Sequence, residues 1–132
     1  MNLSLIDAFG RFGAKPDRLR AVSAIAADGA LVLRCESVNF GHPARGVLRY
    51  EDRLSREPVD AKSVALLGAH LGLARDGELP VRMVVGGPAV ASTPGPRSFH
   101  IRPDLIGKIV EFDGDRFIID FKRREELNRK AR

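Results

Sequence analysis

The sequence predicts an α+β fold, in which a mainly antiparallel sheet packs against one long helix and one short amino-terminal helix. Short runs of alternating apolar and polar residues, separated by Gly, Pro and Asp-Gly turns, are typical of antiparallel strands. One longer segment, ending near residue 74, has apolar residues at helical spacing. The chain has 132 residues, of which 44% are hydrophobic. This size and composition predict one α+β domain over residues 1–121, followed by a basic tail over residues 122–132.

The first predicted elements are a short helix and a hairpin. Ser4 can cap a helix that runs to about Phe12, because its hydroxyl can accept a hydrogen bond from the free amides of the first turn. Residues 19–26 then alternate as a strand. Asp28-Gly29 tolerates the positive φ angles of a tight turn, so residues 30–37 are expected to return as the antiparallel partner.

The middle of the chain predicts a loop, a strand and the long helix. Residues 40–45 contain Gly and Pro and lack alternation, which indicates a loop, whereas residues 47–52 alternate as a third strand. The helix begins at Pro58 or Asp60 and runs to about residue 74. Glycine weakens a helix interior, so Gly68 and Gly72 indicate a place where the helix backbone lies close to a neighbour, most simply the sheet.

The last part of the chain predicts four short strands and a long connection. Residues 80–85 and 98–102 read as strands, and the Gly- and Pro-rich connection 86–97 is expected to be the least ordered internal segment. Residues 108–112 and 116–121 form a second hairpin around an Asp-Gly turn at positions 113 and 114. The resulting order is α-β-β-β-α-β-β-β-β, followed by the basic tail.

Several classes of protein are disfavoured by simple counts. One cysteine cannot form an intramolecular disulfide. No apolar run approaches the ~20 residues of a membrane helix, and Asp7 and Arg11 interrupt the amino terminus where a secretory signal needs an apolar centre. We therefore expect a soluble cytoplasmic protein without a membrane partner.

No diagnostic catalytic or metal-binding motif is present. Cys35, His42, His70 and His100 are isolated from one another, and no pair has the spacing of zinc ligands. The chain also lacks a GxSxG turn and a phosphate-binding glycine loop that leads into a helix. The sequence thus predicts no catalytic residue, no resident metal and no cofactor.

One motif nevertheless suggests an enzyme. Pro103-Asp104, followed by Asp120-Phe121-Lys122 after an apolar run, resembles the PD-(D/E)xK signature of restriction-endonuclease-like nucleases. The resemblance implies that Asp104 and Asp120 would hold Mg²⁺ while Lys122 helps to activate water. A metal-dependent nuclease is therefore one alternative function.

The order of the first six elements also resembles the core of that superfamily, but it implies a different site. It would place Glu36 and the triplet Glu51-Asp52-Arg53 at the catalytic centre. Arg53 departs from the lysine of the family pattern, and an arginine stays protonated and cannot transfer the proton. The two resemblances therefore do not coincide.

The two ends of the chain carry a second resemblance. The stretches DAFGRFGA, residues 7–14, and VEFDGDRF, residues 110–117, are similar to small uncharacterised bacterial proteins that share a DAFxRFGA-like opening. This resemblance implies a bacterial origin and no particular activity.

The formal net charge of +5 is concentrated at the carboxyl end. From residue 122 onward the segment contains six basic residues and only two acidic ones, Glu125 and Glu126, so it carries +4 of the total charge. Such a segment is either a solvated end or an extension that contacts phosphates. The predicted nucleic-acid-binding residues are Arg97, Lys122, Arg123, Arg124, Arg129, Lys130 and Arg132.

These observations predict a small non-catalytic binding protein that contacts the backbone of nucleic acid. Stacking on single strands is disfavoured because Trp is absent and most Phe residues occupy core-like positions, so double-stranded nucleic acid is the expected partner. The alternative is a homodimeric protein-interaction module, in which a strand edge or the helix face with Gly68 and Gly72 meets a second copy.

Overall fold

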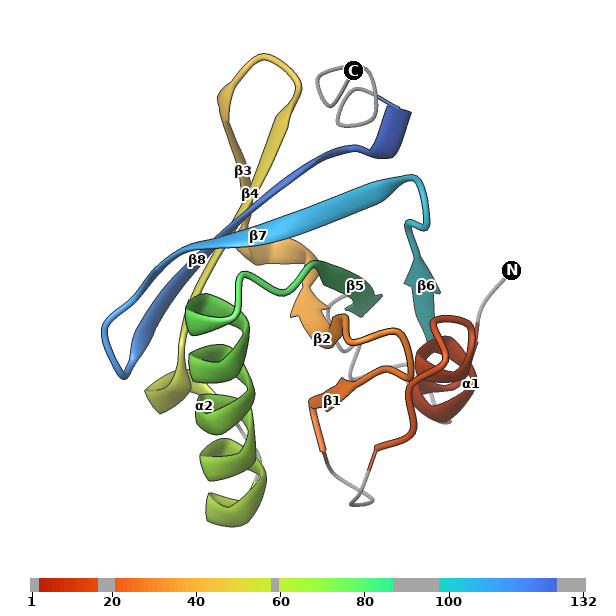
Figure 1. Ribbon diagram of the computed structural model, residues 1–132, viewed down its shortest axis with the longest axis vertical. Coiled ribbons are helices and arrows are strands. Elements are labelled where there is room, and N and C mark those ends of the chain that lie inside the picture. The colour runs from red at the N-terminus through yellow and green to blue at the C-terminus, as the bar shows by residue number, and fades with distance from the viewer. Residues whose placement is uncertain (1–2, 17–20, 58–59, 87–97, 126–132) are drawn as a thin grey trace, which may run out of the picture.

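The computed structural model describes residues 3–16, 21–57, 60–86 and 98–125, and it confirms the α+β fold (Figure 1). An eight-stranded sheet, two α-helices and two 3₁₀ turns make up this part of the chain. The elements are α1 (Leu5–Gly10), β1 (Ser23–Ile25), β2 (Leu31–Glu36), η1 (Ser37–Asn39), β3 (Phe40–Ala44), β4 (Val47–Arg53), η2 (Leu54–Arg56), α2 (Ala61–Asp76), β5 (Val81–Gly86), β6 (Phe99–Ile101), β7 (Leu105–Phe112) and β8 (Arg116–Arg123).

The sheet has the order β1-β2-β5-β7-β8-β4-β3, and β6 pairs with β5 beside this path. All strand pairs are antiparallel except β2 with β5, which is parallel. β3 lies at one edge and β2 next to the other edge, yet only the three residues of η1 join them. The sheet must therefore curl until β2 and β4 approach each other. The contact is direct, because the Glu36 amide donates to the Tyr50 hydroxyl at 3.0 Å.

The curled sheet encloses the main core. Buried side chains from β2, β5, β7 and β8 meet Leu67 and Leu71 of α2 on the inner side. A smaller cluster on the outer side packs Phe9 of α1 against Val32 and Val84. The outer side of β7 and β8 is mixed instead, with the exposed Lys108 and Val110 beside Asp120 and Lys122.

Both Asp-Gly turns are confirmed as tight antiparallel hairpins. Gly29 has φ +90° between β1 and β2, and Gly114 has φ +104° between β7 and β8. The predicted cap of α1 is also present, since the Ser4 hydroxyl accepts from the amide of Asp7 at 3.1 Å. These features depend on residues close together in the chain, which is why the sequence pattern reveals them.

The loop predicted over residues 40–45 is wrong, because residues 40–44 form β3. Phe40 pairs with Tyr50 and Ala44 with Val47, and the register shifts between Gly41 and Ala44. Pro43 lies in this irregular stretch of an edge strand, where its missing amide costs no ladder hydrogen bond. Because the irregularity breaks the alternation, the sequence pattern conceals the strand.

The predicted close approach along α2 is correct for only one glycine. A Cβ on Gly68 would lie 3.2 Å from Leu54 Cδ1, so the close neighbour is η2 and not the sheet. A Cβ on Gly72 would have nothing within 4 Å. The helix begins after Asp60 and continues two residues past the predicted end, to Asp76.

Three further boundaries differ from the predictions. β1 contains only Ser23–Ile25 of the expected strand, although residues 17–20 lie outside the described part. β7 begins at Leu105 rather than at residue 108, and β8 continues to Arg123, two residues beyond the expected end. The predicted disorder of the long connection falls on residues 87–97, which are also outside the described residues.

Candidate nucleic-acid interface

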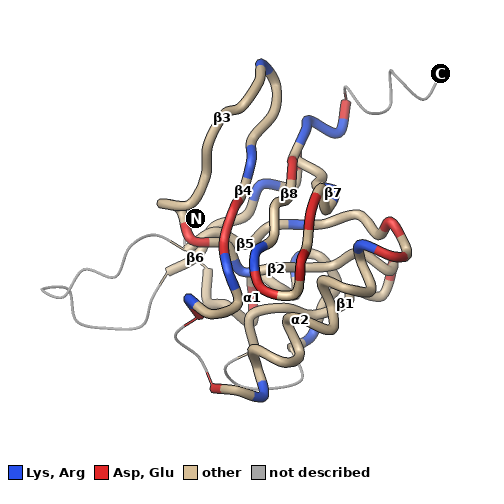
Figure 2. Tube along the Cα trace, turned by 90° about the vertical axis from the view of Figure 1, so that its left-hand side faces the viewer, with Lys and Arg blue, Asp and Glu red and all other residues tan. Residues whose placement is uncertain are grey.

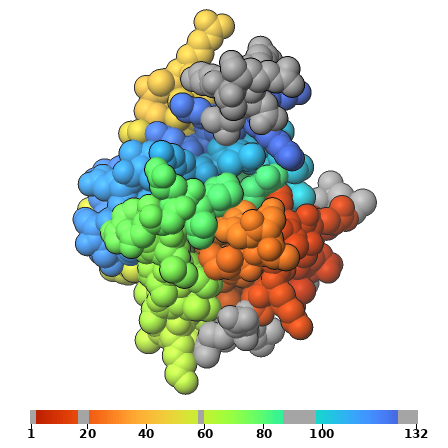
Figure 3. All heavy atoms as spheres, in the orientation of Figure 1, coloured from red at the N-terminus to blue at the C-terminus, as the bar shows by residue number. Residues whose placement is uncertain are grey.

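A hairpin of β3 and β4 projects from the body of the protein (Figures 1 and 3). We call its outer part, residues 41–46, the arm, and all six of these residues are exposed. Pairing between β4 and β8 ends at Leu48 opposite Phe121, so the arm leaves β8 there, while β8 itself stays paired with β7 as far as Arg123. Its turn lies between Ala44 and Val47, and Gly46 there has φ +77°.

The carboxyl end of β8 rises at the same end of the molecule as the arm (Figure 2). We call Lys122, Arg123 and Arg124 the basic strand end. Lys122 is half-buried, while Arg123 and Arg124 are exposed. The amide of Arg124 donates to the Asp104 carbonyl at 2.8 Å, which anchors this segment to the turn between β6 and β7. Among the described residues, none of these three cations has a carboxylate partner within 4.0 Å.

A hollow of about 430 Å³ lies at the basic strand end and is lined by Asp104, Arg123, Arg124 and Glu125. Asp104 is already paired, because Arg102 binds its two carboxylate oxygens at 3.0 and 2.8 Å. This hydrogen bonding lowers the pKa of Asp104. Arg102 is thus the main partner of Asp104, and the nearby charge of Arg123 lowers the pKa of Asp104 further.

Arg82 of β5 adds to the positive potential near the hollow. Its Nη2 donates to the Pro103 carbonyl at 2.8 Å, and its guanidinium lies 4.7 Å from the centre of the Phe12 ring. Burial lowers the pKa of Arg82, and the nearby charge of Arg124 lowers it further. Two like charges held close together make this end of the sheet attractive to an anion.

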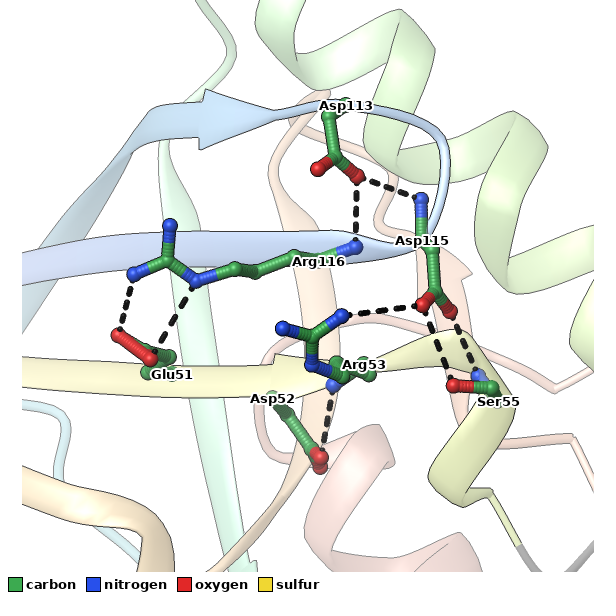
Figure 4. A network of polar contacts seen from close by, with 7 residues as sticks. All are labelled: Glu51, Asp52, Arg53, Ser55, Asp113, Asp115 and Arg116. Carbon is green, nitrogen blue, oxygen red and sulfur yellow. Dashed lines mark hydrogen bonds and ion pairs between the residues drawn. The ribbon is translucent and has the colours of Figure 1, made fainter.

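The opposite end of β4 and β8 differs, because its charges are paired within the fold (Figure 4). Arg116 binds Glu51 at 3.0 Å and Glu111 at 3.3 Å. Arg53 lies 3.5 Å from Asp115, whose other oxygen accepts from the amide of Ser55 at 2.8 Å. The arginines at this end are thus compensated, whereas no ion pair involves Lys122, Arg123 or Arg124 within the described residues.

The carboxylates at the turn of the β7–β8 hairpin are structural. Asp113 accepts from the amides of Asp115 and Arg116 at 2.9 and 2.8 Å. These bonds favour the charged form and lower the pKa of Asp113, and the amide of Ser55 does the same for Asp115. Both groups therefore stabilise the turn and η2, and they do not form a ligand site.

The residues of the nuclease signature are not brought together. Asp104 directly precedes β7, and Lys108, four residues later on β7, is the residue that pairs with Asp120. Strand geometry separates these positions by about 13 Å. Asp120 is also bound by Arg49, at 2.7 and 2.8 Å. Only Asp120 and Lys122 share a strand face, so the arrangement that the resemblance implied is not formed.

The second set of nuclease residues is also divided. Asp52 is buried, where it accepts from the Tyr50 hydroxyl at 3.0 Å and from the amide of Arg53 at 2.8 Å. Glu51 points to the other face of β4 and binds Arg116. In the part of the chain that the structure describes, no three His, Cys, Asp or Glu side chains are grouped to hold a metal ion.

The structure places only part of the predicted nucleic-acid-binding set. Lys122, Arg123 and Arg124 are together at the end of β8. Arg97, Arg129, Lys130 and Arg132 lie outside the described residues. The sequence prediction missed Arg45, at the turn of the arm. One signal could have indicated it, because residues 38–50 contain no Asp or Glu in a chain that has 17.

Comparison with known proteins gives no match: no family model, no curated protein and no solved structure matches the chain. No helix of the described residues is long and apolar enough to cross a membrane.

Proposed function

We propose that this protein is a non-catalytic nucleic-acid-binding protein that contacts the phosphate backbone. One observation carries the proposal: Lys122, Arg123 and Arg124 lie together at the end of β8 without carboxylate partners among the described residues. Phosphate oxygens bind Arg and Lys through charge-assisted hydrogen bonds. Elsewhere on β4 and β8 the arginines are paired, so the charge at this end is available to a ligand.

The experiment compares two triple variants that remove the same charge. The first variant, Lys122→Ala/Arg123→Ala/Arg124→Ala, removes the charges of the basic strand end. The control variant, Arg11→Ala/Arg56→Ala/Lys62→Ala, removes three exposed cations elsewhere on the protein. Binding of a fluorescent DNA duplex is measured by anisotropy over a range of salt concentrations that includes physiological ionic strength. Each phosphate contact contributes about 0.9 to the slope of log K against log salt, so the first variant is expected to lose roughly 2.7.

The control variant is expected to keep most of the slope, since net charge alone gives only weak attraction at physiological salt. Equal losses in the two variants, or no salt-sensitive binding by the wild type, would contradict the proposal. The duplex is also expected to stay intact when Mg²⁺ or Mn²⁺ is added. Cleavage that Asp120→Asn abolishes would instead support the nuclease alternative.

A second candidate function, self-association into a homodimer, is favoured by the outer face of α2. Ala65 and Ala69 are exposed on this face, and Leu73 is 59% exposed. The helix has no charged residue between Lys62 and Arg75. A helix that is apolar on several faces is usually covered, and a second copy of this chain would cover it.

A further inference from the structure

We propose that the arm enters the major groove of B-form DNA while the basic strand end binds phosphates at the edge of that groove. This inference rests on the proposed function, and it adds the kind of nucleic acid and the element that reads it. Three features support this proposal: the dimensions of the arm, its charge and the irregular edge of β3.

The length of the arm matches the depth of the groove. Arg45 precedes Leu48 by three residues, and Leu48 is the paired residue of β4 that lies nearest to the arm. At about 3.3 Å per residue, Arg45 lies roughly 10 Å from the last residue pair between β4 and β8, and the major groove is about 8.5 Å deep. A two-stranded ribbon, with strands about 4.8 Å apart, also fits a groove about 12 Å wide.

The composition of the arm suits a polyanion. Gly41, Ala44 and Gly46 have small side chains or none, so the ribbon stays thin along its outer part. Residues 38–50 contain no acidic side chain, and Arg45 has no carboxylate within 4.0 Å in the described chain. An arginine at the tip of a ribbon can donate two hydrogen bonds to O6 and N7 of guanine, which both face the major groove.

The basic strand end, which is proposed to bind phosphates, begins beside the base of the arm. Phe121 pairs with Leu48, so Lys122 to Arg124 begin where the arm leaves the sheet. The basic strand end therefore starts beside the base of the arm, and a ribbon inserted in the groove would bring these cations close to the flanking phosphates. Phosphates line that mouth on both sides, which gives Arg123 and Arg124 their ligands.

The edge of β3 argues against a peptide as the occupant. A peptide that adds to a sheet needs a regular row of free amides and carbonyls. β3 has Pro43 and a register shift between Gly41 and Ala44, and both features interrupt such a row. A-form RNA is also a poor fit, because its major groove is too narrow for side chains to read.

The test uses Arg45→Ala, with Arg56→Ala as the matched control at another exposed position. We expect Arg45→Ala to weaken duplex DNA binding by about tenfold, the effect of losing one good base contact. Arg56→Ala is expected to change it less than twofold. Binding to an RNA duplex of the same sequence, which uses the phosphates alone, is expected to be equal for wild type and Arg45→Ala.

Methylation by dimethyl sulfate identifies the groove, because the reagent attacks guanine N7 in the major groove and adenine N3 in the minor groove. Wild type is expected to protect guanine N7, and Arg45→Ala to lose this protection. Protection of adenine N3 alone would overturn the inference. If the basic strand end proves essential while Arg45→Ala binds DNA like wild type, the arm inference fails and the proposed function stands. If neither substitution affects binding, both fail.

Discussion

At the scale of single residues, Gly107 shows how tightly the inner side of the sheet is packed. A Cβ built on Gly107 would lie 2.5 Å from Cε1 of Phe121 and 2.9 Å from Cγ2 of Ile119. Both neighbours are fully buried, so neither has space to move. The glycine is therefore needed for the Phe121 ring to pack across β7.

Substitution of Gly107 by alanine is expected to destabilise the protein by about 1–3 kcal/mol through overpacking. Gly72→Ala is the matched control, because a Cβ there has nothing within 4 Å. Since alanine is the better helix former, Gly72→Ala is expected to stabilise by up to about 1 kcal/mol. Urea unfolding of the two variants measures both values. Similar unfolding midpoints would show that the packing at Gly107 is not as tight as described.

At the scale of elements, a polar contact joins β4 to the end of β2 and holds the sheet in its curled shape. The Tyr50 hydroxyl accepts from the amide of Glu36 and donates to Asp52, both at 3.0 Å. Beside it, Arg34 binds Glu57 at 2.8 Å, and both of these side chains are largely buried. Burial raises the pKa of Tyr50 well above its ordinary value, and the charge of Asp52 adds to this effect.

The alkaline stability of the protein is expected to depend on Tyr50. The folded state favours the neutral phenol, so its stabilisation is fully present below about pH 10, where free tyrosine ionises, and decreases as the pH rises further. Tyr50 is the only tyrosine, and Trp is absent, so absorbance at 295 nm reports this group alone. We expect the absorbance to rise together with loss of the circular dichroism signal.

The control is Tyr50→Phe, which is expected to be less stable at neutral pH because Asp52 loses a buried donor, at a cost of about 1–3 kcal/mol. Its stability is also expected to depend less on pH above 10. A rise in absorbance near pH 10 in a protein that is still folded would show that the hydroxyl is accessible to solvent.

At the scale of the whole molecule, the two candidate surfaces lie at opposite ends. The arm and the basic strand end are at one end, and the body of α2 extends toward the other (Figure 1). A ligand on the arm therefore leaves the outer face of α2 uncovered. Nucleic-acid binding and self-association are compatible in this geometry.

If α2 joins two copies, sedimentation equilibrium is expected to give twice the monomer mass of 14.4 kDa. Leu73→Lys places a charge on the exposed face of α2, so this variant is expected to sediment as a monomer. The affinity of each protein chain for DNA is expected to equal that of wild type, because Leu73 is remote from the basic strand end. A monomeric wild type at micromolar concentration would exclude the homodimer.

The sequence by itself determined the features that depend on neighbouring residues. The two Asp-Gly hairpins, the Ser4 cap and the long helix follow from local turn chemistry, capping and apolar spacing, and all are present. The basic strand end was also visible as a run of cations. Each of these signals lies within a few residues of the structure it predicts.

Only the tertiary structure decided which charges remain free and where the arm lies. β3 forms because Phe40 and Ala44 find partners on β4, although their own sequence lacks alternation. Asp120 is bound by Arg49, 71 positions away in the chain, whereas Lys122 keeps its charge unpaired among the described residues. Strand pairing and ion pairing join residues that are distant in sequence, so their outcome depends on the curl of the whole sheet and is not encoded in any local pattern.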